Sequence, residues 1–273
     1  MDNKEQSGLW NGAAGEAWVE AQQLLDRMFE PFELLLAREA AASNARSVLD
    51  VGCGTGATTL AIVAATGGEA MGVDISRPMI ALAEARSRRA DSKARFVVAD
   101  AQTHVFPDAH YDRIVSRFGV MFFSDPVAAF TNLRRAAIAG ASLQCIAFRS
   151  AAENPFMTAA ERAAAPLLPD LPARKPEGPG QFALADSAFV RHVLEAAGWK
   201  SIAIQPLDMV CTMPASALDQ YLTRLGPVGL ILRNADENTK ARVLAAVHAA
   251  FAPWVHGDEI RFDAACWDIQ ASS

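Results

Sequence analysis

This 273-residue sequence has few of the residues that build disulfide frameworks, metal sites, membrane spans or nucleic-acid surfaces. Its four cysteines, Cys53, Cys145, Cys211 and Cys266, are widely spaced and never form a C-x-x-C pair, so neither a zinc site nor a dithiol motif is expected. No run of 18 apolar residues occurs, which leaves no candidate membrane span. The net charge is −6, with 25 basic and 31 acidic side chains, and this balance disfavours a nucleic-acid partner.

Two further scarcities shape the expectations. The first six residues, Met1 to Gln6, lack a basic region followed by an apolar one, so we expect neither export nor a membrane partner and predict a cytoplasmic protein. The basic clusters Arg86–Arg89 and Arg134–Arg135 stand near predicted helix ends, where we interpret them as solvated charges facing helix dipoles. With 51% hydrophobic residues and a mean hydropathy of +0.11, the composition fits one α/β domain with insertions.

The most informative feature present is the run from Val48 to Gly56. It predicts a buried strand that ends in a turn containing Gly52, Gly54 and Gly56, followed by a helix that begins near Ala57. Glycines let the backbone turn sharply and approach a ligand, and the helix offers unpaired amides and a positive end. The pattern predicts a nucleotide-like ligand.

Two acids follow at the ends of the next predicted strands. Asp74 ends the strand that begins at Glu69, and Asp100 follows the strand from Ala94 to Ala99. The carboxyl ends of parallel strands face the ligand crevice, where a carboxylate can accept hydrogen bonds from both ribose hydroxyls. We assign the ribose to Asp74 and the exocyclic amine of an adenine to Asp100.

With these residues in place, the sequence from about Val48 to Arg149 resembles the class I S-adenosylmethionine-dependent methyltransferases. The family's first motif matches Asp50 and the three glycines, its ribose acid matches Asp74, and its adenine-side acid matches Asp100. The segments Trp10–Gly12 and Asp112–Phe118 are similar to the ubiquinone and menaquinone C-methyltransferase branch. The resemblance implies S-adenosylmethionine as the cofactor.

The predicted cofactor-binding set spans the N-terminal segment, the glycine turn and the ends of three later strands. It comprises Trp18, Asp50, Gly52, Cys53, Gly54, Gly56, Asp74, Ile75, Met79, Asp100, Ala101, Arg117 and Phe118. Cys53 either touches the cofactor or simply fits the turn. The run Phe118 to Phe123 is expected beside the donor methyl group, with Phe118, Met121, Phe122 or Phe123 lining the acceptor pocket or packing as ordinary core.

Two alternatives stay open. Gly52, Gly54 and Ala57 also satisfy the G-x-G-x-x-G/A pattern of dinucleotide oxidoreductases. Asp50 argues against them, because a carboxylate there suits a cationic ammonium and repels a pyrophosphate. The second alternative is a non-catalytic protein that binds S-adenosylmethionine as a structural or sensory ligand, since binding and turnover use the same turn.

The periodicity predicts an α/β fold with a doubly wound, Rossmann-like sheet of seven strands, mostly parallel with an antiparallel last strand. A helical N-terminal segment from about Gly15 to Ala42, interrupted by Pro31, lies within residues 1–45, and the cofactor-binding core covers 46–149. Strands are expected near 48–52, 70–74, 95–99, 112–117 and 142–149, with helices near 56–66, 77–90 and 126–138. We predict one methyltransferase domain over residues 1–273.

The second half carries the predicted cap, in two insertions at 150–185 and 211–256. Six prolines between Ala151 and Ala185 exclude a continuous helix and favour a lid, with one short helix near 156–165. Further helices are expected at 186–198, 214–232 and 234–251, and strands at 201–210 and 259–269. The resemblance implies that such insertions cover the acceptor site.

No catalytic residue is obligatory, because methyl transfer from a sulfonium depends mainly on holding donor and acceptor in line. The candidate bases are His104, His110, His192, His248, His256, Tyr111 and Tyr221, and for each a structural role is the stronger interpretation. Asp125 stands without the acidic partners of a metal-dependent mechanism, so no metal is expected. We predict a small-molecule acceptor methylated on oxygen, nitrogen or carbon, and the sequence is compatible with a homodimer.

Overall fold

The computed structural model describes residues 3–174 and 178–273. Its centre is a sheet with the strand order β3-β2-β1-β4-β5-β8-β6, and a short strand, β7, pairs with β8. The strands are β1 (Ser47–Val51), β2 (Glu69–Asp74), β3 (Arg95–Val98), β4 (Tyr111–Arg117), β5 (Ala137–Phe148), β6 (Lys200–Pro214), β7 (Val255–His256) and β8 (Glu259–Ser272). The predicted doubly wound α/β sheet is confirmed, and within the described residues the two-residue β7 is the one addition to the seven predicted strands.

The first five strands are parallel, and β8 runs antiparallel to both β5 and β6. The chain moves outward from β1 to β3 and then returns to the other side of β1 with β4, so the strand order reverses between β1 and β4. Ligands of open α/β sheets bind at this reversal, outside the carboxyl ends of the strands.

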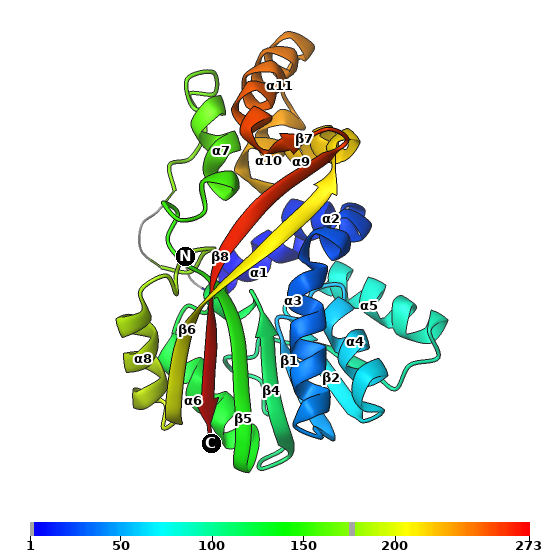
Figure 1. The fold of residues 1–273 in the computed structure, drawn as a ribbon, viewed down its shortest axis with the longest axis vertical. Helices are drawn as coiled ribbons and strands as arrows, with labels where there is room; N and C mark the ends of the chain where they lie inside the picture. The colour runs from blue at the N-terminus through cyan, green and yellow to red at the C-terminus, as the bar shows by residue number, and fades with distance from the viewer. Residues whose placement is uncertain (1–2, 175–177) are drawn as a thin grey trace.

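Helices cover both faces of the sheet (Figure 1). On one side lie α3 (Gln22–Ala42), α4 (Ala57–Thr66) and α5 (Arg77–Arg89), and on the other lie α6 (Pro126–Ala136) and α8 (Ser187–Ala196). The core-facing residues of α3 recur at helical spacing, with Phe29, Phe32 and Leu36 all buried. This apolar stripe is what holds α3 on the sheet.

The N-terminal segment differs from the expectation in two ways. A helix, α1 (Asn3–Asn11), precedes the predicted one and contains Trp10, and α2 (Ala13–Glu20) separates it from α3. Pro31 lies inside α3 without ending it. A proline removes one hydrogen bond and strains one turn, and the buried apolar stripe on both sides of Pro31 keeps the helix continuous.

Beyond the core, β6 and β8 continue as a two-stranded arm. β5 pairs with β8 only from Cys266 onward, whereas β6 and β8 stay paired out to Pro214 and Glu259. Figure 1 shows this arm rising diagonally from the sheet to a group of helices. The predicted strands at 201–210 and 259–269 are thus confirmed, but β6 extends further into the arm, to Pro214, and β8 extends further into the core sheet, to Ser272.

The cap helices pack on the arm and on one another. They are α7 (Pro155–Ala164), α9 (Leu218–Arg224), α10 (Gly226–Leu232) and α11 (Glu237–Phe251). The ring of Phe156 stacks on Phe262 of β8 at 3.7 Å and also contacts Phe251. The single helix predicted over 214–232 is wrong, since Leu225 is extended and Gly226 has a φ of +69°, which divides it into α9 and α10.

Candidate functional site

The glycine turn after β1 adopts the left-handed backbone that its sequence anticipates. Gly52, Gly54 and Gly56 have φ values of +68°, +54° and +85°. A Cβ on Gly52 would meet the backbone of Gly119 at 2.5 Å, and one on Gly56 would meet the ring of Phe96 at 2.8 Å. These two glycines are therefore required for packing.

Gly54 has different surroundings. The nearest atom to a Cβ placed there is the sulfur of Met79, at 3.6 Å. Space above Gly54 is therefore open to a ligand, and the backbone at this position can be approached closely.

Asp74 holds the turn from the end of β2. Its carboxylate accepts hydrogen bonds from the backbone N–H of Gly54 and of Ser76, each at 2.8 Å. Burial raises the pKa of Asp74, and the backbone amides oppose that rise because they favour the charged form. A carboxylate oxygen accepts more than one hydrogen bond, so the pinned carboxylate keeps lone pairs for further donors.

Asp50 is the most deeply buried acid of the site, with 1% of its surface exposed. One carboxylate oxygen accepts a hydrogen bond from the Thr59 hydroxyl at 2.6 Å, and the other has no hydrogen-bond partner among residues 3–174 and 178–273. Burial raises the pKa of Asp50 to about 6, against the opposing effects of Thr59 and Arg117. A buried carboxylate oxygen without a donor is costly, and a cationic ligand group would satisfy it.

Asp100 and Ala101 lie at the end of β3. The Asp100 carboxylate accepts hydrogen bonds from the N–H of Gln102 at 3.0 Å and the hydroxyl of Thr103 at 3.1 Å. Asn132 of α6 donates to the carbonyls of Ala101 and His104, both at 2.9 Å. The loop after β3 is thereby fixed against the neighbouring helix.

The end of β4 is held to β1 by Ser116. Its hydroxyl donates to the Val51 carbonyl at 2.7 Å and accepts from the N–H groups of Gly119 and Val120 at 3.1 and 3.2 Å. Sequence reasoning gave Ser116 no role. The signal was available in its position between the strand and Gly119, because serine hydroxyls commonly bond backbone groups in turns.

Phe118 follows β4 with a φ of +67°, a conformation that costs a bulky residue about 1–3 kcal/mol and persists where its surroundings fix it. Its ring stacks on Phe148 at 4.4 Å and meets Phe29 and Phe32 edge-on. Arg117 donates to the carbonyl of Phe29 at 3.3 Å. Phe118 is thus locked in an aromatic cluster between β4, β5 and α3.

Trp18 belongs to a second aromatic group. Its ring meets Trp10 edge-on at 5.9 Å, and Trp10 meets Phe122 at 5.3 Å. The Asn11 amide donates to the Ile75 carbonyl at 2.9 Å, and the Ser76 hydroxyl donates to the Trp10 carbonyl at 2.7 Å. The N-terminal helices are therefore attached to the turn that directly follows Asp74.

The remaining predicted residues lie within the same group of strand ends. The structure brings together, at the carboxyl ends of β1 to β4, the residues Asp50, Gly52, Cys53, Gly54, Gly56, Asp74, Ile75, Met79, Asp100, Ala101, Arg117 and Phe118. Burial raises the pKa of the Cys53 thiol well above its ordinary value, so the thiol is neutral. The contact of each residue with a cofactor remains a prediction.

The sequence analysis did not predict the surroundings of two charged residues near the turn. Glu33 of α3 is half-buried, and burial raises its pKa while the charge of Arg117 opposes the rise. Arg86 was interpreted as a solvated charge, which is wrong: its guanidinium forms an ion pair with Asp26 at 2.6 Å. Whether an arginine near the end of a helix faces solvent or a neighbouring helix depends on how the helices pack. The local sequence around Arg86 does not indicate that packing.

Of the five histidines, His104 lies in the loop after β3, where its N–H donates to the Asp100 carbonyl at 2.8 Å, and the other four lie elsewhere. His110, His192, His248 and His256 are exposed, and His104 packs edge-on against Phe106 at 4.7 Å. Tyr221 lies in the cap cluster against Phe156, where burial raises the pKa of its hydroxyl. The structural roles expected for these residues stay a prediction.

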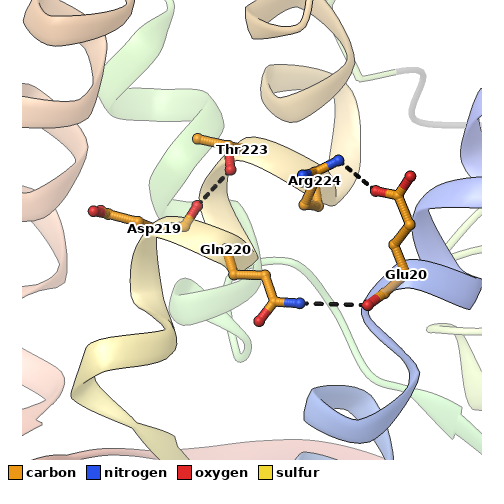
Figure 2. Close-up of a pocket in the computed structure, with 5 residues that line it drawn as sticks. All are labelled: Glu20, Asp219, Gln220, Thr223 and Arg224. Carbon is orange, nitrogen blue, oxygen red and sulfur yellow. Dashed lines mark hydrogen bonds and ion pairs between the residues drawn. The ribbon is translucent and has the colours of Figure 1, made fainter.

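A surface hollow of about 420 Å³ lies at the junction of α2 and the cap (Figure 2). Arg224 forms an ion pair with Glu20 at 2.5 Å, and the Gln220 amide donates to the Glu20 carbonyl at 3.4 Å. The lining residues are Glu20, Asp219, Gln220, Thr223 and Arg224, none of which belongs to the predicted cofactor set. The N-terminal helices thus contact the cap directly.

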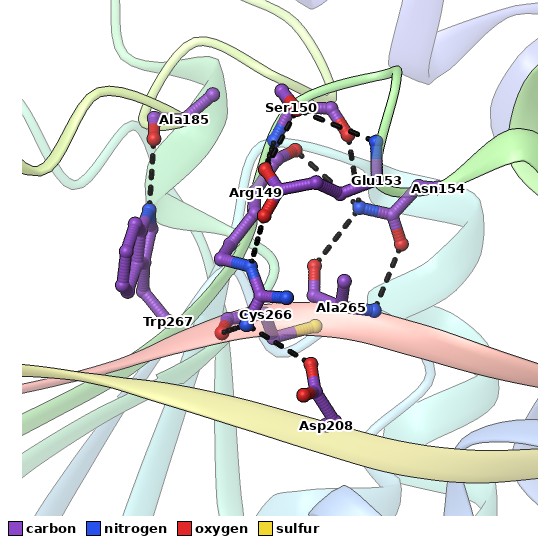
Figure 3. A network of polar contacts seen from close by, with 9 residues as sticks. All are labelled: Arg149, Ser150, Glu153, Asn154, Ala185, Asp208, Ala265, Cys266 and Trp267. Atoms are coloured by element: carbon purple, nitrogen blue, oxygen red, sulfur yellow. Dashed lines mark hydrogen bonds and ion pairs between the residues drawn. The ribbon is translucent and has the colours of Figure 1, made fainter.

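A polar network joins the core to the start of the cap (Figure 3). Arg149 forms ion pairs with Glu153 and Asp208, both at 2.9 Å, and its guanidinium lies over the ring of Trp267. The buried Asn154 amide donates to the Ala265 carbonyl and accepts from the Ala265 N–H, both at 2.9 Å. Asn154 therefore bonds β8 as a neighbouring strand would.

Across residues 3–174 and 178–273, no helix is long and apolar enough to cross a membrane. Within the same ranges, no group of three or more His, Cys, Asp or Glu side chains is arranged to hold a metal ion.

The segment of this chain that is similar to known protein families contains the strands that build this site. The model of the family described as "Methyltransferase domain" matches residues 48–140. The demethylmenaquinone methyltransferase of Thermus thermophilus is 33% identical over 104 residues, which cover 38% of this chain and 47% of that protein. The ajmaline N-methyltransferase of Rauvolfia serpentina is 30% identical over 100 residues, covering 36% and 34%. The chain thus spans half or less of the length of these curated relatives.

Solved structures extend the likeness in fold to most of the chain. The crystal structure of YcgJ from Bacillus subtilis superposes with a TM-score of 0.58 over 89% of this chain and 98% of that chain, at 17% sequence identity. At this identity the likeness establishes the fold alone. Residues 48–140 thus match the methyltransferase-domain family, and the fold is shared with YcgJ over most of the chain; together these likenesses support a class I S-adenosylmethionine-dependent methyltransferase.

Proposed function

We propose that this protein binds S-adenosylmethionine at the carboxyl ends of β1 to β4 and transfers its methyl group to a small molecule. The observation that carries the proposal is the unpartnered, buried oxygen of Asp50 beside the open space above Gly54. An ammonium group supplies the donor that Asp50 lacks, and the backbone of Gly54 admits a ligand at close range. Both features fit an amino-acid-bearing nucleoside.

Different residues of the site would bind different parts of the cofactor. Asp74, held by two backbone amides, would accept the ribose hydroxyls, and Asp100 would accept the adenine amine. Arg117 and Phe118 would border the methyl-bearing end. When bound, S-adenosylmethionine supplies an electrophilic methyl group on a sulfonium.

The charge of the site opposes the dinucleotide alternative. Asp50 places a carboxylate next to the glycine turn, and this charge disfavours a pyrophosphate at that position. Asp74 does not discriminate, because dinucleotide-binding sites also carry an acid there for the ribose. Burial raises the pKa of both groups, and the negative charge of Asp74 adds to the rise at Asp50. A cationic ligand would lower the free-energy cost of ionising these carboxylates, and an anionic ligand would increase it.

For the transfer itself we favour proximity and alignment. None of the exposed histidines lies in the aromatic clusters around Phe118, so the described side chains provide no histidine base there. The protein would hold the acceptor atom in line with the methyl group and exclude water, which supplies a large share of the rate for such displacements. The acceptor atom is oxygen, nitrogen or carbon.

The cap insertions, 150–185 and 211–256, would border the acceptor as parts of a single domain. Aromatic side chains of both segments pack together, as Phe156 of α7 contacts Phe251 of α11. The curated relatives are named for small acceptors, a demethylmenaquinone and ajmaline, which supports a small-molecule substrate. We further propose that the protein has no nucleic-acid partner, because acidic side chains outnumber basic ones, and that it acts in the cytoplasm.

Two measurements test the proposal. Calorimetry should detect S-adenosylhomocysteine binding and no binding of a nicotinamide dinucleotide. Incubation of a metabolite panel with a methyl-labelled donor, followed by mass spectrometry, should reveal an acceptor that gains one methyl group. Preferential dinucleotide binding would overturn the assignment, and tight binding with no transfer across the panel would favour the non-catalytic alternative.

A further inference from the structure

Arg86 connects three elements that meet beneath the glycine turn. It lies on α5, and its side chain is 20% exposed. One terminal nitrogen donates to the carbonyl oxygen of Thr55 at 2.8 Å and to the Thr55 hydroxyl at 3.3 Å. The other forms the ion pair with Asp26 of α3 at 2.6 Å. A single guanidinium thus bonds the turn with one nitrogen and the N-terminal helix with the other.

Asp26 is itself held in place. The amide of Gln22, one turn earlier on α3, donates to the same carboxylate oxygen that receives Arg86. A guanidinium is planar and presents its donors in a fixed fork, so anchoring one nitrogen on Asp26 sets the direction of the other. The donor that reaches Thr55 is therefore oriented before a ligand binds.

The turn needs such an anchor because its sequence gives it little rigidity. Gly54 and Gly56 flank Thr55, and glycine has the greatest backbone freedom. Gly56 occupies the N-cap position of α4, where it has no side chain that could cap the helix. On the β2 side, Asp74 fixes the N–H of Gly54. The opposite side of the turn has Arg86, which fixes the carbonyl of Thr55.

We propose that Arg86 is a positioning residue for the cofactor, which holds the Gly54–Gly56 turn in its ligand-binding conformation while Asp26 orients it. Arg86 touches neither the cofactor nor the acceptor in this role. It acts by lowering the entropy that the turn loses on binding. The inference rests on the proposed function for the identity of the ligand.

Replacement of Arg86 by glutamine, with a matched control on the same helix, tests the inference. Arg88 forms an exposed ion pair with Glu84, so Arg88→Gln makes the same chemical change on α5 away from the turn. Calorimetry with S-adenosylhomocysteine at a temperature well below unfolding should show binding weakened about 10- to 100-fold in Arg86→Gln, the range for loss of charge-assisted hydrogen bonds. Arg88→Gln should bind as the unmodified protein does.

Two further variants separate positioning from a general loss of stability. Arg86→Lys keeps the charge but has no fork, so it should recover part of the affinity. Asp26→Asn leaves Arg86 in place without its anchor and should weaken binding several-fold, which also provides the test if Arg86→Gln does not fold. Amide hydrogen exchange of residues 54–57 in the ligand-free protein should accelerate in Arg86→Gln and Asp26→Asn alone.

The outcomes distinguish this inference from the proposed function. If the unmodified protein does not bind S-adenosylhomocysteine, the proposed function fails. If it binds, and Arg86→Gln binds equally well, the positioning role is overturned and the proposed function stands. A lower melting temperature with unchanged affinity likewise overturns positioning, because it assigns Arg86 to stability only.

Discussion

The backbones of Gly52 and Gly119 lie in direct contact, so that a Cβ on Gly52 would be 2.5 Å from the α-carbon of Gly119, and one on Gly119 would be 2.6 Å from that of Gly52. The ends of β1 and β4 therefore meet without any side chain between them. This contact lies at the point where the strand order reverses. Gly52 and Gly119 are therefore needed for packing, whereas Gly54 faces open space.

Gly52→Ala should destabilise the fold. The new methyl group would strike backbone, which moves only with both strands, and the φ of +68° adds about 1–2 kcal/mol. Gly67→Ala is the control, since Gly67 has a φ of +65° and no neighbour within 4 Å of its Cβ position. Chemical denaturation should show a clearly larger loss for Gly52→Ala; equal losses would refute the steric account.

Gly54→Ala should instead reduce cofactor affinity. Its backbone cost resembles that of Gly67→Ala, because both positions have a positive φ and lack close contacts. The added methyl group occupies the space through which we expect the ligand to approach. Calorimetry with S-adenosylhomocysteine should show at least about tenfold weaker binding for Gly54→Ala only. Similar affinities in the two variants would place the ligand elsewhere.

Asp74→Asn should weaken cofactor binding by about 1.5–3 kcal/mol, the value of hydrogen bonds to a charged group. Asp112 offers a matched control, because its carboxylate accepts from the N–H groups of Arg46 and Ser47 at the opposite end of β1. Both variants lose charge-assisted bonds to two backbone amides. Only Asp74→Asn should change the dissociation constant, and a comparable change in Asp112→Asn would attribute the effect to stability.

Asp50 should make both stability and binding depend on pH near 6. Burial raises its pKa in the folded state to about 6 from 3.8, so the folded protein favours the protonated form. The stabilisation is complete below pH 3.8 and is lost as the pH rises through 6. The shift is worth about 3 kcal/mol. Asp50→Asn should remove this pH dependence from denaturation curves recorded between pH 4 and 7.

Cofactor affinity should change in the opposite direction. A cationic ligand favours ionised Asp50, so binding of S-adenosylmethionine should tighten between pH 5 and 7 and release a proton. Calorimetry in buffers of different ionisation enthalpy measures that release. An affinity that does not vary with pH would show that Asp50 does not meet the cationic group.

Asn154→Asp should loosen the cap from the core. The amide bonds both backbone groups of Ala265, and a carboxylate would set a buried oxygen against the Ala265 carbonyl. A loss of about 2–4 kcal/mol is expected. Asn238→Asp, at an exposed position of α11, should be nearly neutral. Equal melting temperatures for the two variants would contradict the role of Asn154.

The strands and helices of the cofactor half could be predicted because local signals coincide there. The run before Gly52 is apolar, the glycines need positive φ, and Asp74 ends a strand, so pattern and turn chemistry indicate one arrangement. The strand at 95–99 was placed within one residue of β3 (Arg95–Val98). The acids of the site follow from the same logic, since parallel strands bring their carboxyl ends to one edge.

Features set by long-range packing could not be predicted in this way. The contacts of Arg86 depend on how α5 packs relative to the glycine turn and α3, because its partners Thr55 and Asp26 are 31 and 60 residues away in the chain. The bonds of Asn154 to β8 join positions 111 residues apart. The division of the 214–232 helix has a local cause, because Gly226 permits a positive φ. An isolated glycine within a helical pattern can also lie inside a continuous helix, so its presence alone did not predict the break.

The β6–β8 arm has a mechanical consequence. The part of β8 beyond Cys266 comprises residues 259–265, which span about 24 Å at the usual rise per residue. Within the described residues this part of β8 pairs with β6 and with the short β7 but not with β5, and it carries the stacked Phe262, so a tilt of the arm against the sheet would be centred near Cys266. A tilt of about 5° there would displace the far end of the arm, and the cap with it, by about 2 Å.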